Sequence, residues 1–281
     1  MKRLLCFLIC ILFLPAFCVG EESTAAETLV IHFLDVGQGD ATLIQCGGQT
    51  LMIDGGDKNA NQFIYSYLTE LGLTHLDYII ATHPHDDHVK GLATALMVCD
   101  AGTVYSPVTK YDGDGFRDFT DKLTERGLGI TIPHRGDTFN LGSATVIFLT
   151  EPQEFWDLND QSLMVKIVFG NTSFVFTGDA AWDAEQDAIS SGIDLMADIL
   201  KVGHHGAITS TSQAFLDAVQ PKYAIISVGA GNKYGHPADE TLMKFQHMYI
   251  SVYRTDKHGT IICTSDGEHI GFTMSKKNRK W

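Results

Sequence analysis

The segment His-Pro-His-Asp-Asp-His, residues 83–88, constrains the fold of this chain more than any other stretch of its sequence. It follows directly on residues 76–82, an apolar run whose length predicts a buried strand. Because Pro84 disfavours helical geometry at His83, we expect an extended loop in which alternate side chains project to one side. A buried strand that ends in such a loop indicates a layered α/β fold with the loop at one edge of a sheet.

The side chains of this loop are of the types that bind metals. In an extended loop His83, His85 and Asp87 can converge, and His88 turns in where the next helix begins. Imidazoles and carboxylates together suit zinc, iron or manganese, and four such ligands rarely crowd one ion from so short a loop. We therefore expect two divalent metal ions. The alternative is a polar surface loop that holds three histidines by chance.

The rest of the chain alternates short apolar runs with helical patterns and glycine turns. Strands are expected at residues 29–35, 41–45, 50–54, 76–82, 144–150, 163–169, 173–177, 199–203, 223–228, 251–255, 260–264 and 269–273. Helices are expected at residues 64–71, 89–98, 116–126 and 184–190. Two sheets with helices outside them is the natural packing for this order, since each set of strands must bury one face against another layer.

The first twenty residues differ in pattern from the rest of the chain. Lys2 and Arg3 precede an apolar run over residues 4–14, and small residues lead to Gly20, which together match a secretory signal. The run is shorter than the ~20 residues that span a bilayer. We expect cleavage after Gly20, a secreted or cell-surface protein and no transmembrane domain in the mature chain. Retention as an anchor and lipidation at Cys18 are the alternatives.

The remaining chain divides into a short linker at 21–28, one large domain at 29–275 and a basic tail at 276–281. Loss of the two basic residues of the signal would take the net charge from −14 to −16. Such a surface repels nucleic acid as a whole, so a polyanion would need a local basic track. The tail is expected to be solvated, and no protein partner is evident from the sequence.

Further segments accompany the histidine-rich loop in a fixed order. They are Asp35-Val36-Gly37-Gln38-Gly39-Asp40-Ala41, Ile53-Asp54-Gly55-Gly56, Asn159-x-x-Ser162-Leu163, Thr177-Gly178-Asp179, Val202-Gly203-His204-His205-Gly206 and Tyr234-Gly235-His236-Pro237. With His-x-His-x-Asp-His, this order resembles the soluble hydrolase domain of ComEC-type DNA-uptake proteins, in the metallo-β-lactamase fold superfamily. The resemblance implies an αββα four-layer sandwich with metals at one edge, between the sheets.

The resemblance also implies a role for each matching residue. His83 and His85 would hold the first metal, Asp87 and His88 the second, and Asp179 would bridge them. Independently of the resemblance, Asp179 is a candidate metal ligand, because it ends an apolar strand where a carboxylate can point to the same sheet edge. Its alternative role is to cap the helix after it.

Two adjacent histidines later in the chain, His204 and His205, are also candidate ligands. In an extended backbone neighbours face opposite ways, so we expect one of His204 and His205 to reach a metal. We favour His205 as a ligand of the first metal and His204 as a donor to the leaving group, and the resemblance implies that His236 completes the second metal. The third first-metal histidine of true β-lactamases is replaced by the stretch from Asn159 to Ser162, which we place behind the ligands. This departure disfavours β-lactam hydrolysis.

Other polar residues are expected to support the chemistry. Asp54 is predicted to hydrogen-bond a ligand histidine and fix its tautomer, and Asp40 to lie near the same edge. Two divalent metals lower the pKa of a bridging water and clamp the oxygens of an in-line displacement, which suits phosphoester hydrolysis. The hypothesis is attack by a metal-bridged hydroxide on a phosphodiester, oriented by Asp179, with His204 or Lys233 assisting the leaving oxygen.

The sequence is compatible with more than one substrate. The two metal ions are expected to be Zn²⁺ or Mn²⁺, and the phosphodiester could be DNA or a cell-wall polymer that carries phosphocholine-like groups. The negative charge argues against a nuclease. Lactone or β-lactam hydrolysis and a non-catalytic metal-binding module are the remaining alternatives.

Overall fold

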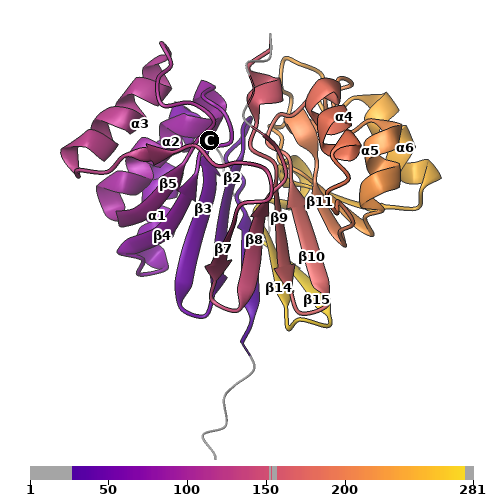
Figure 1. Ribbon diagram of the computed structural model, residues 1–281, viewed down its shortest axis with the longest axis horizontal. Helices are drawn as coiled ribbons and strands as arrows, with labels where there is room; N and C mark the ends of the chain where they lie inside the picture. The colour runs from indigo at the N-terminus through magenta and orange to yellow at the C-terminus, as the bar shows by residue number, and fades with distance from the viewer. Residues whose placement is uncertain (1–26, 152, 154–156, 276–281) are drawn as a thin grey trace, which may run out of the picture.

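A computed structural model describes residues 27–151, 153 and 157–275 of the chain. The expected signal, most of the expected linker and the basic tail lie outside the described residues. Two sheets pack face to face between two layers of helices, so the predicted αββα four-layer sandwich is confirmed (Figure 1). No helix in the described ranges is both long enough and apolar enough to cross a membrane.

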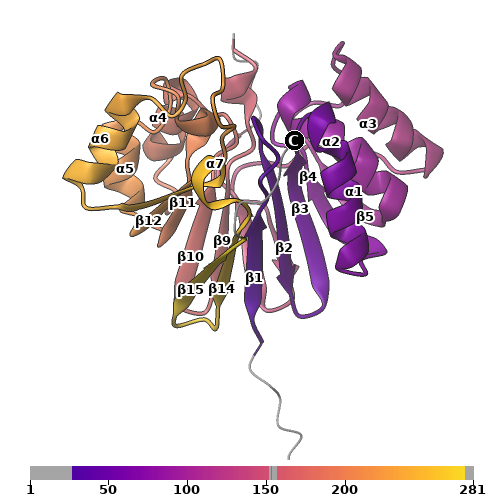
Figure 2. The same ribbon diagram turned by 180° about the vertical axis from the view of Figure 1, so that it is seen from behind.

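The first sheet has eight strands. Their spatial order is β15 (Ile270–Met274), β14 (Ile261–Ser265), β1 (Leu29–Phe33), β2 (Ala41–Cys46), β3 (Gln49–Gly55), β4 (His75–Ile80), β5 (Asp100–Tyr105) and β6 (Ile130–Thr131). Strands β1 to β3 form an antiparallel meander, and β3 to β6 run parallel. The helices that cover this sheet are α1 (Asn61–Glu70), α2 (Asp86–Val98) and α3 (Asp114–Glu125), as Figures 1 and 2 show.

The second sheet has seven strands. Their order is β13 (Ser251–Arg254), β12 (Tyr223–Ile226), β11 (Ile199–Lys201), β10 (Thr172–Phe176), β9 (Val165–Phe169), β8 (Ala144–Phe148) and β7 (Thr138–Leu141). Strands β10 to β13 run parallel. Its outer helices are α4 (Trp182–Ser190), α5 (Gln213–Val219) and α6 (Asp239–His247) (Figure 2). Short helical turns complete the fold at η1 (Lys58–Ala60), η2 (Asn159–Gln161), η3 (Gly203–Gly206) and α7 (Thr255–His258).

Three apolar cores hold the four layers together. Between the sheets, the rings of Phe33 and Phe176 stack with centroids 5.9 Å apart. Leu92 and Phe119 are buried between the first sheet and its helices. Phe215 and Phe245 are buried between the second sheet and its helices. Burial of this kind contributes about 25 cal/mol per Å² of apolar surface, so the layers position the strand ends firmly.

The candidate residues lie at one edge because part of each sheet consists of parallel strands. The carboxyl ends of parallel strands meet at the same edge of a sheet, where open α/β folds bind ligands. In the first sheet these ends lead into Asp54 and the segment 82–88. In the second they lead into Asp179 after β10, His204 and His205 after β11, and the loop 227–238 after β12.

The structure corrects the local prediction for the histidine-rich segment. Helix α2 begins at Asp86, not at residue 89, so Asp87 lies in its first turn instead of in an extended loop. His88, which was expected where the helix begins, lies in the same turn. His85, the N-cap, is extended with φ −69° and ψ 149°. Asp86 and Asp87 suit this position because carboxylates are favourable near the positive end of a helix dipole. The strands β5 to β7 and the helices α5 and α6 were also missed.

Candidate metal centre

Two histidines anchor the segment after β4 in the interior. The side chains of His83 and His88 are 0% exposed, which excludes the polar surface loop. The segment is tied to the end of β3, since Thr82 donates its backbone N–H and its hydroxyl to the carboxylate of Asp54, at 2.8 and 2.7 Å. Nε2 of His83 lies 3.0 Å from Nδ1 of His85. The tie to β3 therefore fixes the direction in which the imidazoles point.

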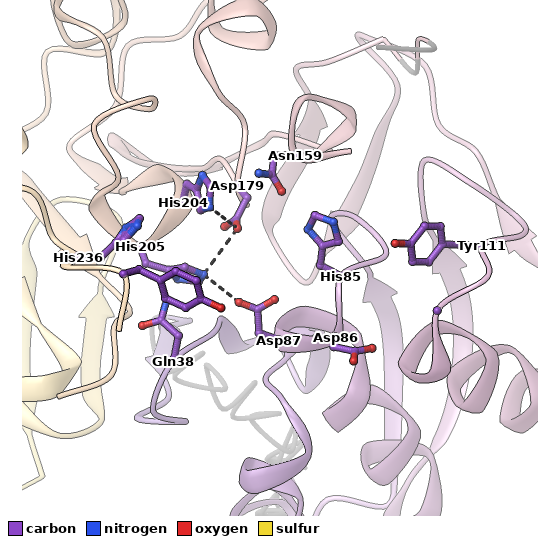
Figure 3. Close-up of a pocket in the computed structure, with 12 residues that line it drawn as sticks. Gln38, His85, Asp86, Asp87, Tyr111, Asn159, Asp179, His204, His205 and His236 are labelled. Carbon is purple, nitrogen blue, oxygen red and sulfur yellow. Dashed lines mark ion pairs between the residues drawn. The ribbon is translucent and has the colours of Figure 1, made fainter. Parts of the chain in front are cut away.

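Asp179 occupies the centre of the cluster, as Figure 3 shows for the residues drawn there. Its Oδ1 lies 3.3 Å from Nε2 of His88. Its Oδ2 lies 3.9 Å from Nε2 of His83, 3.7 Å from that of His204 and 3.6 Å from that of His205. One carboxylate thus faces imidazoles from both sheets, which is the geometry a bridging ligand needs.

Asp179 does not cap the helix after it. The N-cap of α4 is Ala181, whose own side chain makes no capping hydrogen bond. Instead Oδ1 of Asp160 accepts hydrogen bonds from the N–H groups of Ala181 and Ala184, at 3.0 and 3.2 Å. The capping alternative for Asp179 is wrong, because Asp160 satisfies the helix terminus and leaves Asp179 to face the cluster.

The two adjacent histidines after β11 depart from the expected backbone. His204 and His205 both adopt left-handed conformations, with φ of 47° and 55°, so the predicted extended backbone is wrong. Both Nε2 atoms consequently turn toward Asp179. Nε2 of His205 also lies 3.3 Å from Oδ2 of Asp87. The geometry therefore groups His205 with Asp87 and His88, the pair expected for the second metal, rather than with the residues expected for the first.

The remaining predicted residues lie at different distances from the centre. The ring of His236 lies 5.5 Å from that of His204, and both line the same cavity. Asn159 lines that cavity as well. The Oγ of Ser162 accepts a hydrogen bond from the N–H of Asp179, at 3.1 Å, and lies 3.4 Å from Nδ1 of His83. Ser162 therefore contacts and helps to position two candidate ligands, Asp179 and His83.

Lys233 does not line the central cavity. Its side chain is exposed, and its Nζ lies 5.0 Å from the centroid of the Tyr234 ring. It lines an adjoining cavity that shares Asp87 with the centre. The structure thus places Lys233 beside the centre, not within it, because the loop that carries it runs over the rim.

A carboxylate stands behind an imidazole on each side of the centre. Oδ2 of Asp54 lies 2.8 Å from Nδ1 of His88, the contact that the sequence predicts for it. Oδ1 of Asp40 lies 3.2 Å from Nδ1 of His205. A carboxylate at Nδ1 leaves Nε2 free to bind a metal and fixes the ring orientation.

Lys201 is a supporting residue that was not predicted from the sequence. Its Nζ lies 2.7 Å from Oδ2 of Asp40, and its side chain is only 2% exposed. It also donates a hydrogen bond to the carbonyl of Val202 at 2.9 Å. A lysine in a short apolar strand just before two histidines was the available signal, because a buried charge requires a partner.

Glycine permits the close approach that assembles this edge. The N–H of Asp40 donates to the carbonyl of Asp87 at 3.2 Å. A Cβ at Gly39, where φ is 131°, would lie 2.3 Å from that same carbonyl oxygen. A side chain at this position would push the loop of Asp40 away from α2.

The donor atoms fit divalent metal ions. Nε2 of His88, Nε2 of His205 and Oδ1 of Asp179 are buried and have no hydrogen-bond partner among the described residues. Buried polar atoms are normally satisfied, so a cluster of three that face one another indicates a bound cation. Imidazole nitrogens and carboxylate oxygens suit Zn²⁺ and Mn²⁺. His83, His88 and Asp179 form one potential group, and Asp87, His88 and His205 form another.

The electrostatics of the cluster are strongly coupled. Burial would raise the pKa of Asp179, but the imidazoles of His88 and His205 hold it well below its ordinary value. Burial would lower the pKa of His205, but the carboxylates of Asp179 and Asp40 raise it to about 10. The site therefore keeps the carboxylates of Asp179 and Asp87 ionised, which favours a bound cation.

The centre opens into a cavity of about 400 Å³. Besides the candidate ligands, Gln38, Tyr111 and Tyr234 line it, and none of these three was predicted as a site residue. Figure 3 shows Tyr111 on the side of His85 and Gln38 below His205. Gln38 and Tyr234 lie in segments that carry the resemblance, which was the available signal, whereas no pattern in the sequence singles out Tyr111.

A four-layer αββα sandwich with histidine and aspartate donors at the shared edge of its sheets defines a metal-dependent hydrolase. The chain belongs to the metallo-beta-lactamase superfamily, which matches residues 34–230. Among solved structures, the metallo-beta-lactamase fold protein YhfI of Bacillus subtilis has a TM-score of 0.55 at 13% identity, covering 85% of this chain and 100% of that one. This likeness shows the fold.

ComEC-type competence proteins are relatives of the chain. ComE operon protein 3 of Bacillus subtilis is 31% identical over 258 residues, which cover 82% of this chain and 32% of that protein. Competence protein ComA of Neisseria gonorrhoeae is 27% identical over 243 residues, which cover 85% and 33%. The chain thus spans about a third of the length of these curated relatives.

Proposed function

We propose that the protein is a secreted hydrolase of phosphodiester bonds that works with two divalent metal ions, Zn²⁺ or Mn²⁺. The observation that carries the proposal is the position of Asp179, whose carboxylate lies between imidazoles of both sheets within 3.9 Å. His83, His85 and Asp179 would hold one ion. Asp87, His88 and Asp179 would hold the other, and His205 would join this second set.

The chain's own residues bind and orient the substrate. The metal ions, when bound, lower the pKa of a water and stabilise the charge that develops on the phosphoryl oxygens. His204 lies at the opening, with 28% of its side chain exposed, and can donate a proton from Nε2 to the leaving oxygen. Its neighbour His236 lines the same cavity and would complete the second metal site, as the resemblance implies.

The natural substrate would be DNA or a cell-wall polymer with phosphodiester bonds. Kinship with competence proteins supports DNA. The net charge of −14 opposes broad contact with any polyanion, so binding would depend on a local cationic region. Secretion rests on the signal-like pattern of the first twenty residues.

Hydrolysis of bis-p-nitrophenyl phosphate by the chain loaded with Mn²⁺ or Zn²⁺ tests the proposal. The substitution Asp179→Asn should lower kcat/KM by more than the roughly 100-fold that loss of a residue behind a ligand costs. Asp183→Asn is the matched control, because Asp183 is exposed on α4 and should leave the rate unchanged. Equal rates in the Asp179→Asn variant and the wild type would refute the proposal.

A further inference from the structure

A second cavity of about 580 Å³ adjoins the metal centre. It shares Gln38, Asp86, Asp87 and Tyr234 with the central cavity, so the two are adjacent. Its lining residues are Gln38, Asp57, Lys58, Asp86, Asp87, Lys90, Asn232, Lys233 and Tyr234. We call it the lysine cavity, because three lysines from three separate segments meet there in a chain whose net charge is −14.

Two of these lysines are available to an anion. Lys90 is paired with Asp86, at 2.6 Å. In the part of the chain that the structure describes, no ion pair occupies Lys58 or Lys233. Both side chains are exposed, so they can reach a bound group without a cost of burial.

The acidic residues of the lysine cavity are already engaged. The carboxylate of Asp57 accepts hydrogen bonds from the N–H and the side-chain amide of Asn59, at 2.7 and 2.8 Å. Asp86 is paired with Lys90, and Asp87 lies 3.3 Å from Nε2 of His205. Lys58 and Lys233 therefore have no direct carboxylate partner among the described residues. The three aspartates keep their formal charge, so the lining as a whole has as many acidic as basic side chains.

The edge of the centre at His204 and His236 has a different chemistry. A cavity of about 250 Å³ there is lined by His204, Ala207, Ile208, Thr209, Tyr234, Gly235, His236 and Ala238. No lysine, arginine, aspartate or glutamate is among these residues, and Ile208 is 51% exposed. A substrate with a second anionic group would consequently place that group on the Asp87 side.

We propose that the lysine cavity binds a second phosphate group of the substrate, next to the phosphodiester that is cleaved, through Lys58 and Lys233. The inference rests on the proposed phosphodiesterase function. It defines the substrate as a polymer with repeated phosphates. Nucleic acid and polyol-phosphate polymers share this chemistry, and Lys ammonium groups bind phosphate as point charges.

Kinetics on substrates of two sizes test the inference. The measured quantity is the ratio of kcat/KM on a polymer to kcat/KM on bis-p-nitrophenyl phosphate, with a single-stranded oligodeoxynucleotide and a poly(glycerol phosphate) as the two polymers. Lys58→Gln and Lys233→Gln should each lower this ratio about tenfold, because a hydrogen bond to a charged group is lost. Lys222→Gln is the matched control, since Lys222 is exposed and paired only with Asp198.

A binding measurement separates this inference from the proposed function. The apparent affinity for the labelled polymer should fall with salt, and the slope of log K against log[salt] should flatten by about 0.7–0.9 in each lysine variant. Loss of binding in these variants would support the cavity even if no phosphodiester were hydrolysed. An unchanged ratio and slope with both polymers would overturn the inference, and the polymer that responds identifies the source of the phosphate.

Discussion

The first sheet delivers its candidate ligands from one continuous stretch, residues 83–88, whereas the second delivers Asp179, His205 and His236 from three separate loops. The first set lies in the short connection from β4 to α2 and in the first turn of that helix. The second set includes residues with positive φ and depends on contacts between distant segments. The positions of the ligands from the first sheet therefore follow from local structure, whereas those from the second sheet depend on the tertiary fold.

The two sides meet in a buried ion pair, and removing it should have the largest effect. Asp40 comes from the first sheet's side and Lys201 from the second, with 2.7 Å between Nζ and Oδ2. Lys201→Met should lower the free energy of unfolding by about 3–5 kcal/mol, because the buried carboxylate of Asp40 loses its lysine partner and keeps only the contact with His205. Urea unfolding measures it.

A surface pair of the first sheet's helices provides the contrast. Lys90→Met removes a partner of Asp86, which is 50% exposed, and should cost less than about 1 kcal/mol. The double variant with Lys201→Met and Asp40→Asn should recover much of the loss seen with Lys201→Met alone. Equal costs for Lys201→Met and Lys90→Met would mean that the buried pair does not join the two sides.

The irregular loop of the second sheet depends on a carboxyl group with an unusual pKa. Glu185 on α4 accepts hydrogen bonds from the N–H groups of Thr211 and Ser212. Burial raises its pKa from 4.5 to about 7, although these hydrogen bonds and nearby Lys244 act in the opposite direction. The folded state therefore binds more protons than the unfolded state between pH 4.5 and about 7.

The free energy of unfolding should consequently fall as the pH rises through this interval, by up to about 3 kcal/mol from this group. Denaturant unfolding at pH 4.5, 5.5, 6.5 and 7.5 measures the effect. Glu185→Gln should flatten the profile, and Asp183→Asn on the same helix should not. A profile that keeps its slope in Glu185→Gln would show that another group titrates.

The smallest expected change in the free energy of unfolding comes from backbone strain. Its sign should differ between His204, after the second sheet's β11, and His85, after the first sheet's β4. His204 has a φ of 47°, which costs an L-residue about 1–2 kcal/mol, whereas His85 has a φ of −69°. His204→Gly should raise the free energy of unfolding by roughly 0.5–1 kcal/mol, and His85→Gly should lower it by a similar amount. Thermal unfolding of the two variants would contradict the comparison if both moved the same way.

The sequence predicted most of the regular structure in this molecule. Alternating apolar runs predicted the four layers, because each sheet must bury a face. The segment from His83 to His88 was recognisable since its ligands are neighbours. The start of α2 was misplaced because Pro84 indicates a break but not where the helix resumes after it.

The second sheet's contribution was harder to predict. Nothing local in Gly-His-His-Gly requires a left-handed backbone; it follows from the turn between β11 and the loop beyond it. The pairing of Lys201 with Asp40 joins residues far apart in the chain, so only the packed sheets reveal it. The grouping of His205 with Asp87 was missed for the same reason.

The number of metal ions bound per chain tests whether the two sides of the site share a pair of cations at Asp179. Elemental analysis of the chain after loading with Mn²⁺ or Zn²⁺ and removal of free metal should give two ions per chain. Asp179→Asn should retain clearly fewer, and Asp183→Asn should retain two. A wild-type chain that binds no metal, or an Asp179→Asn variant that still holds two ions, would contradict the account.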